Sequence, residues 1–160
     1  MKRIGVLVVL MAMAACSKPQ EGKPGKAAEP PELALQDTEC PGGTVRGCLE
    51  AAREADKKGD VARAFELHER VCKVGVAREC TLLGSLVWQG RGVSADPARA
   101  YALYMRGCEG EDAAGCFNAA ICHRTGACAP KDEALATNLL RRACDGNDRR
   151  ACDALKTPVQ

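Results

Sequence analysis

Residues 80–108 decide the fold of this chain and read CTLLGSLVWQGRGVSADPARAYALYMRGC. Residues 80–89 are mostly apolar, and the glycines of Gly90-Arg91-Gly92 that follow suit the end of a helix and a turn. Asp96 before Pro97 is typical of a helix N-cap followed by the first helical residue. A second amphipathic helix fits the remainder of the segment. These residues therefore predict a helical hairpin.

The hairpin recurs at a period of 36 residues. Cys72, Cys108 and Cys144 keep this period, and each is followed eight residues later by another cysteine. Cys40 lies 32 residues before Cys72, so the first unit is four residues shorter. Other residue types keep the period in three units: Asp60, Asp96 and Asp132; Ala64, Ala100 and Ala136; Leu67, Leu103 and Leu139; Arg70, Arg106 and Arg142.

A period in the mid-thirties with regular Ala and Leu is typical of paired helices stacked in a solenoid. We therefore expect an all-α fold, an α/α solenoid of about three disulfide-linked helical hairpins. The domain should span residues 40–160, with hairpins at about 45–72, 80–108 and 116–144 and a partial helix at 152–157.

The chain has 11 cysteines, and setting Cys16 aside leaves ten, an even number that suggests disulfides in an exported protein. Eight residues along one helix separate two Cα atoms by about 12 Å, which is too far for a bridge. A turn must therefore lie between the partners, so each bridge should tie one hairpin to the next and contribute about 2–3 kcal/mol. The pairs at this spacing are Cys40–Cys48, Cys72–Cys80, Cys108–Cys116 and Cys144–Cys152.

Cys122 and Cys128 fall outside this spacing. A fifth disulfide across the turn of the third hairpin is the simpler interpretation. Alternatively, Cys122, His123 and Cys128 could offer three metal ligands, but no fourth is visible. We expect neither a metal nor a cofactor.

The first fifteen residues resemble an export signal. Met1-Lys2-Arg3 is basic, and the 12 uncharged residues 4–15 would span about 18 Å as a helix, well short of a ~30 Å bilayer core. Met13-Ala14-Ala15-Cys16 resembles the bacterial lipoprotein signal, in which the cysteine is acylated and becomes the mature N-terminus. The alternative is an ordinary secreted protein with a chance cysteine at the cleavage site.

Residues 16–39 are expected to form the lipidated N-terminus and a flexible tether, because the segment holds four of the eight prolines among charged and small residues. Ser17, with no Asp there, resembles the sorting pattern for outer-membrane lipoproteins. We therefore expect a protein that is lipid-anchored in the bacterial cell envelope, at the outer membrane.

Charge and composition argue against nucleic acid as the partner. Lys and Arg number 23 and Asp and Glu 21, so the net charge of +2 falls to zero once Lys2 and Arg3 leave with the signal peptide. Phosphate binding needs a gathered basic excess, and aromatic residues at 3% are too few for stacking platforms.

The repeat residues resemble the Sel1-like repeat family, in its cysteine-rich branch of the Helicobacter cysteine-rich protein type. The pattern is clearest at Leu83-Gly84, Gly90-Arg91-Gly92-Val93, Asp96 and Ala100, and in the Cys-x7-Cys that ends at Cys116. Val87 and Asn118-Ala119-Ala120 depart from it, and the short first turn, Lys57-Lys58-Gly59, is closer to a tetratricopeptide repeat. The resemblance implies a solenoid whose concave face binds proteins or peptides. Some family members have been named penicillin-binding proteins or weak β-lactamases.

The sequence offers little for catalysis, so we expect no enzyme. A serine β-lactamase typically needs Ser-x-x-Lys, but the residues three beyond Ser17, Ser85 and Ser94 are Gln, Trp and Pro. Only two histidines are present, and a thiol-redox role lacks a Cys-x-x-Cys motif. We expect His68 on an exposed or groove face, and Trp88 either packed against the next repeat or contacting a partner.

These observations favour a membrane-anchored scaffold or adaptor that binds an envelope protein or peptide. The alternative is a penicillin-binding protein or weak β-lactamase of the cysteine-rich family.

Overall fold

The structure, a computed structural model, describes residues 40–156, so the expected signal peptide, Cys16 and the tether lie outside the described residues. Residues 40–156 form seven α-helices and one short 3-10 helix, without a strand. Their bounds are η1 (Pro41–Gly43), α1 (Val45–Lys58), α2 (Val61–Lys73), α3 (Ala77–Gln89), α4 (Pro97–Glu109), α5 (Ala113–Thr125), α6 (Glu133–Asp145) and α7 (Arg149–Lys156).

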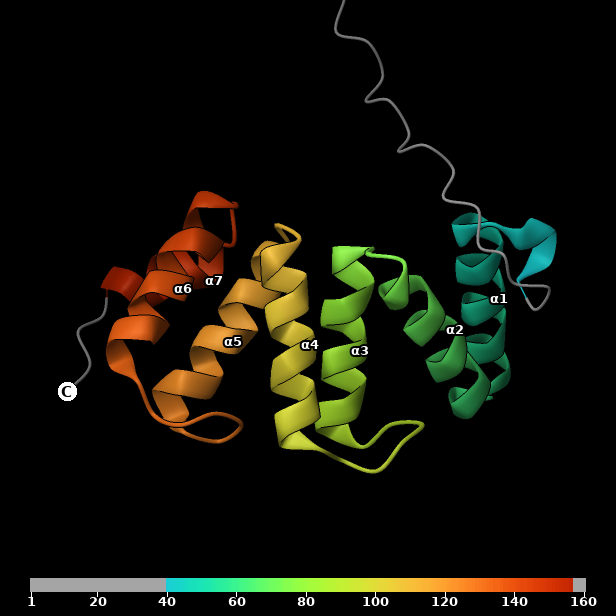
Figure 1. The fold of residues 1–160 in the computed structure, drawn as a ribbon, viewed down its shortest axis with the longest axis horizontal. Helices are drawn as coiled ribbons and strands as arrows, with labels where there is room; N and C mark the ends of the chain where they lie inside the picture. Colours follow the sequence, from blue (N-terminus) through green and yellow to red (C-terminus); the bar gives the residue numbers. More distant parts are fainter. Residues whose placement is uncertain (1–39, 157–160) are drawn as a thin grey trace, which may run out of the picture.

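The helices pair in chain order as three hairpins, α1/α2, α3/α4 and α5/α6, which stack side by side (Figure 1). Each hairpin packs on the next through its second helix, so α2 meets α3, α4 meets α5 and α6 meets α7. The eight-residue α7 is the first helix of an incomplete fourth unit. The predicted all-α solenoid of about three hairpins is confirmed.

An aspartate begins the second helix of every hairpin. The side chain of Asp96 accepts a hydrogen bond from the backbone N–H of Arg99 at 2.9 Å, and Asp60 and Asp132 do the same for their helices. Gly90 ends α3 with a φ of 68°, a left-handed conformation that glycine adopts without strain. The capping and stop signals expected from the sequence at these positions are confirmed.

Helices α3, α5 and α7 begin three residues earlier than expected, whereas α1 begins at Val45, as expected. α5 starts at Ala113 because Asp112 accepts a hydrogen bond from the backbone N–H of Gly115 at 3.1 Å, and α3 starts at Ala77 without such a cap. In the four pairs spaced eight residues apart, the second cysteine is the fourth residue of its helix and lies within the first turn, as Cys116 does in α5.

Five disulfides lie within the described residues. Their Cα–Cα distances range from 4.4 to 4.9 Å, and the pairs are Cys40–Cys48, Cys72–Cys80, Cys108–Cys116, Cys122–Cys128 and Cys144–Cys152. Three of them join the last turn of one hairpin to the first turn of the next unit. Cys122–Cys128 instead closes the α5–α6 turn, and Cys40–Cys48 ties η1 to α1.

The buried apolar residues form two clusters. The larger runs from Phe65 through α3, α4, α5 and α6 to Ala151. The smaller belongs to the first hairpin and contains Cys40, Cys48, Ala52, Leu67 and Val71. The first hairpin therefore has an apolar core of its own, next to the main core.

None of the helices in residues 40–156 combines the length and the apolar character that a membrane span requires.

Candidate functional site

A groove of about 310 Å³ lies between α3 and α5, with α4 and the α5–α6 turn also contributing. Because α3 and α5 are the first helices of neighbouring hairpins, the stacking of the repeats creates this groove. Its lining residues are Ser85, Trp88, Gln89, Tyr104, Phe117, Asn118, Ile121, Cys122, Thr125, Ala127 and Cys128.

Aromatic side chains provide much of the apolar surface of the groove. Trp88 is 42% exposed although it is a large apolar residue, and Leu82, on the same helix, is 40% exposed. Tyr104 is buried, and this burial raises the pKa of its phenol, while a hydrogen bond with Ser85 opposes the shift. Phe117 is half-buried. An exposed Trp beside other aromatic rings is the kind of surface that forms hot spots in protein interfaces.

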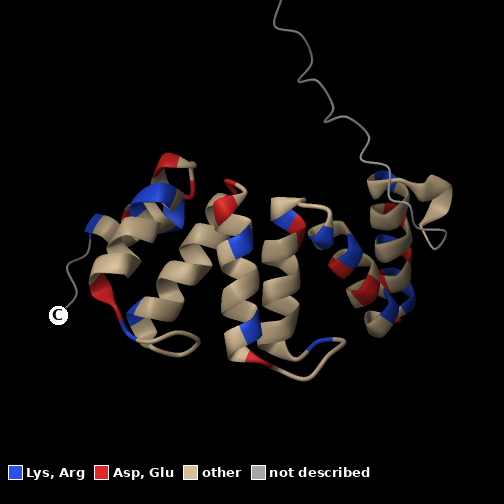
Figure 2. Ribbon diagram, viewed as in Figure 1, with Lys and Arg blue, Asp and Glu red and all other residues tan. Residues whose placement is uncertain are grey.

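The polar groups of the groove are uncharged. The hydroxyl of Ser85 donates to the Thr81 carbonyl at 3.2 Å, and that of Thr125 donates to the Ile121 carbonyl at 2.8 Å. Gln89 and Asn118 contribute side-chain amides. Figure 2 shows that α3 and α5 carry Lys, Arg, Asp or Glu only near their ends, whereas α1 is charged along its length. The groove therefore suits an uncharged segment better than a charged one.

One wall of the groove is fixed by a disulfide and a histidine. Cys122 and Cys128 are bonded, and Nδ1 of His123 lies 2.8 Å from the carbonyl oxygen of Pro130. A carbonyl can only accept, so Nδ1 carries the hydrogen, and Nε2 accepts from the Tyr101 hydroxyl at 2.8 Å. All the atoms of the alternative Cys-His-Cys metal set are thus engaged, and no other group of His, Cys, Asp or Glu in residues 40–156 could hold a metal.

Arg150 of α7 packs against Phe117, a residue that lines the groove. Its guanidinium carbon lies 4.3 Å from the ring centroid of Phe117, in a cation–π arrangement, and its Nε donates to Asp148 at 3.0 Å. The first helix of the incomplete fourth unit therefore supports the α5 side of the groove.

The expectation for His68 was wrong. Its side chain is buried, with Nδ1 2.7 Å from Oε2 of Glu79 in the next hairpin. The position lies between Glu66 and Glu69 and looks solvent-facing in the sequence. Glu79 supplies the charge that makes burial of the imidazole favourable.

The structure places Trp88 in the groove, whereas Cys16 lies outside the described residues. The sequence analysis did not identify Phe117, Asn118 or Ile121 as groove residues. The sequence did contain a sign of this surface: α5 has no charged residue before Arg124, and a solvent-facing helix is usually more polar.

No feature of the groove favours the hydrolase alternative. Ser85 is the serine that lines it, and its hydroxyl hydrogen goes to the Thr81 carbonyl. Neither Lys nor His is among the lining residues, so Ser85 has no adjacent base there.

The stacked hairpins and the uncharged groove together define a helical-repeat scaffold. Residues 80–112 and 113–148 match the Sel1 repeat family, so the chain contains two Sel1 repeats. They correspond to the second and third hairpins with the turns that follow. The resemblance seen in the sequence is thus confirmed.

Solved structures share this fold. Helicobacter pylori cysteine rich protein B superposes with a TM-score of 0.59 at 24% identity, covering 68% of this chain and 80% of its own. A Sel1 repeat protein from Oxalobacter formigenes gives 0.65 at 20% identity, covering 70% and 87%. A protective antigen of uropathogenic Escherichia coli strains gives 0.64 at 20% identity, covering 69% and 25%. A comparison with curated protein sequences gives no match.

Proposed function

We propose that this protein is a protein–protein interaction scaffold that binds an uncharged, largely apolar segment of a partner in the α3–α5 groove. The observation that carries the proposal is the exposed Trp88 in a groove without charged lining residues. The two Sel1 repeats support it, because a repeat stack offers a binding surface and supplies no activated nucleophile.

The dimensions of the groove favour a short segment. A space of about 310 Å³ accommodates a few side chains of a peptide or one face of a helix. Burial of Trp88 would supply much of the apolar contribution to binding. The amides of Gln89 and Asn118 are placed to hydrogen-bond the backbone of the partner, which would otherwise be left unsatisfied.

We also propose that the scaffold is anchored in the cell envelope. The support is the sequence of the first 39 residues, in which Cys16 follows a lipoprotein-like signal and precedes a Pro-rich tether. An outer-membrane location and an envelope protein as partner are part of this proposal.

Site-specific photo-crosslinking in cells tests the groove. A benzophenone side chain placed at Asn118, in the groove, should crosslink to a partner, whereas the same group at Leu135 should not. Leu135 is a matched control because it is 37% exposed and lies on α6, outside the groove lining.

The Trp88→Ala substitution should abolish the crosslink from position 118, and Leu135→Ala should leave it unchanged. Mass spectrometry of the crosslinked product then identifies the partner. Equal crosslinking from positions 118 and 135, or crosslinking that survives Trp88→Ala, would show that this groove is not the binding site.

A further inference from the structure

The three junctions between successive units share one geometry but differ in chemistry. In each junction, the residue four before the first cysteine of the bridge belongs to the second helix of a hairpin. The residue directly before the second cysteine belongs to the next helix. These two positions hold His68 and Glu79 at the first junction, Tyr104 and Gly115 at the second, and Leu140 and Ala151 at the third.

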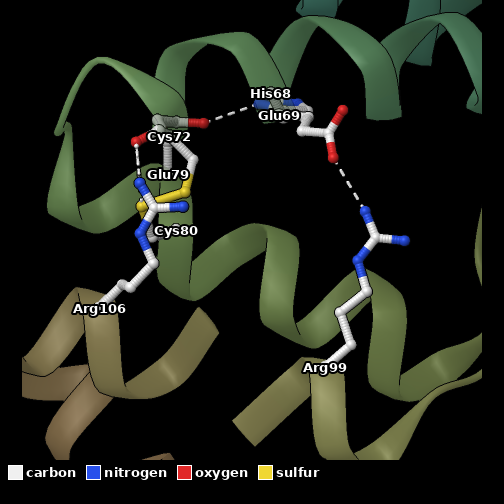
Figure 3. The surroundings of a disulfide bond; sticks show 7 residues. All are labelled: His68, Glu69, Cys72, Glu79, Cys80, Arg99 and Arg106. Carbon is white, nitrogen blue, oxygen red and sulfur yellow. Dashed lines mark hydrogen bonds and ion pairs between the residues drawn. A yellow bond between two sulfur atoms is a disulfide. The ribbon is translucent and has the colours of Figure 1, made fainter. Parts of the chain in front are cut away.

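The first junction therefore contains a buried ionisable pair, shown in Figure 3 beside the Cys72–Cys80 disulfide. The side chain of His68 is 7% exposed and that of Glu79 is 12% exposed, with Nδ1 and Oε2 2.7 Å apart. The other ring nitrogen, Nε2, lies 3.8 Å from Oδ2 of Asp56 in α1. One imidazole thus faces carboxylates from two neighbouring helices.

Two arginines of α4 at this junction bind groups other than His68. From α4, Arg99 donates to Glu69 at 2.9 Å, and Arg106 donates to the Cys72 carbonyl at 3.1 Å (Figure 3). The groups that face the His68 ring from the packed helices are therefore Asp56 of α1 and Glu79 of α3, and both are acidic.

The other two junctions cannot hold such a pair. The second has no space for it, and the third has no ionisable side chains at these positions. A Cβ atom at Gly115 would lie 2.8 Å from the carbonyl oxygen of Tyr104, so a longer side chain does not fit there. At the third junction Leu140 and Ala151 are fully buried and apolar. Neither junction contains a pair that titrates between pH 5 and 9.

We propose that the first junction is a pH-sensitive joint, tight when His68 is protonated and loosened when it is neutral, while the other two junctions do not respond. The first hairpin has a small apolar cluster of its own, while Phe65 and Cys72 of α2 belong to the main core, so the proposed change is a local loosening at the junction. The Cys72–Cys80 bridge keeps the two hairpins attached, so the change does not separate them.

The direction follows from the charges. The hydrogen bond with Glu79 raises the pKa of His68, desolvation opposes this shift, and the negative charges of Glu79 and Asp56 add to it. Because the folded pKa lies above the unfolded value, the stabilisation is complete below the unfolded pKa. It is lost as the pH rises through the folded pKa. A neutral imidazole then leaves the Glu79 carboxylate buried without a counter-charge.

The test measures His68 titration and junction stability on the oxidised protein. NMR follows the two imidazoles between pH 5.5 and 8.5, with His123 as an internal comparison because its ring nitrogens contact a hydroxyl and a carbonyl. Hydrogen-exchange protection factors, corrected for intrinsic rates, are measured for α1, α2 and α5 over the same range. The chain supplies the matched variant, since His68→Leu with Glu79→Ala reproduces the third junction.

In the unsubstituted protein, protection in α1 and α2 should fall severalfold along the titration curve of His68, while α5 stays constant. The double variant should show no such fall. If it does not fold, His68→Gln should show the loosened state at every pH, because glutamine cannot be protonated. The proposal would be overturned if protection in α1 and α2 did not follow the His68 titration, or if protection fell equally in α5. It would also be overturned if either variant kept the pH dependence of protection.

Discussion

At the scale of single residues, Asp96 sets where α4 begins. Its carboxylate accepts the backbone N–H of Arg99, one of the donors that a helix start leaves without a partner. Asp96→Ala should therefore lower the free energy of unfolding by about 0.5–2 kcal/mol, measured by urea denaturation. Asp96→Ser, which keeps an accepting oxygen, should recover most of the loss. An Ala variant as stable as the Ser variant would contradict the capping role.

Asp148 gives a residue-scale prediction for low pH. Hydrogen bonds from Arg150 lower the pKa of this carboxyl, and burial opposes the shift. Because the folded pKa is below the unfolded value, the stabilisation is present above the unfolded pKa and is lost as the pH falls through the folded one. Asp148→Asn should melt at a lower temperature than the unsubstituted protein at pH 7, and the difference should close towards pH 2.5. A difference that is constant over this range would refute the assignment.

Among single residues, the helix caps could be predicted from the sequence, but the burial of His68 could not. The caps at Asp60 and Asp96 could be predicted because the carboxylate and its N–H partner are three residues apart. The burial of His68 could not, since it depends on Glu79 in another hairpin. The visible sign was Glu79 itself, which occupies a position where the other units have glycine or alanine.

At the scale of helices, the disulfides fix the junctions between hairpins. Replacing both Cys108 and Cys116 with Ala should lower the free energy of unfolding by about 2–3 kcal/mol, because the unfolded chain without the bridge has a higher conformational entropy. Glu111 lies between the two cysteines and is exposed, so Glu111→Gln should change stability by less than about 0.5 kcal/mol. Thermal melting compares the two variants, and equal melting temperatures would rule out a stabilising role for this bridge.

Helix positions could be predicted to within one turn. The period of the cysteines placed the hairpins, but the cysteines do not mark the helix ends. Asp112 lies four residues before Cys116 and begins α5, and Asp148 holds the same place before Cys152. The groove between α3 and α5 was beyond prediction, because it depends on how closely neighbouring hairpins stack.

At the scale of the whole molecule, the proposed lipid anchor would determine where the scaffold works. Cys16→Ala should move the protein from the membrane fraction to the soluble fraction of fractionated cells, because acylation at this cysteine is the expected attachment. Immunoblotting of the two fractions measures the change, and Ser17→Ala serves as a control that keeps the cysteine. Continued membrane retention of the Cys16→Ala variant would contradict the anchoring proposal.

The repeat architecture was predictable as a whole because each unit contacts mainly its neighbours, so local spacing determines the global shape. The binding partner was not predictable, because it depends on a few exposed side chains and not on the period.

The disulfide pattern has a consequence for biogenesis. After Cys16, every bridge joins a cysteine to the next one along the chain, and the two are six or eight residues apart. When a chain enters an oxidising compartment from its N-terminus, both cysteines of one bridge arrive before the cysteines of the next bridge. Sequential oxidation of consecutive thiols therefore yields the native bridges directly. Maturation should need an oxidant but no isomerase to correct mispaired cysteines.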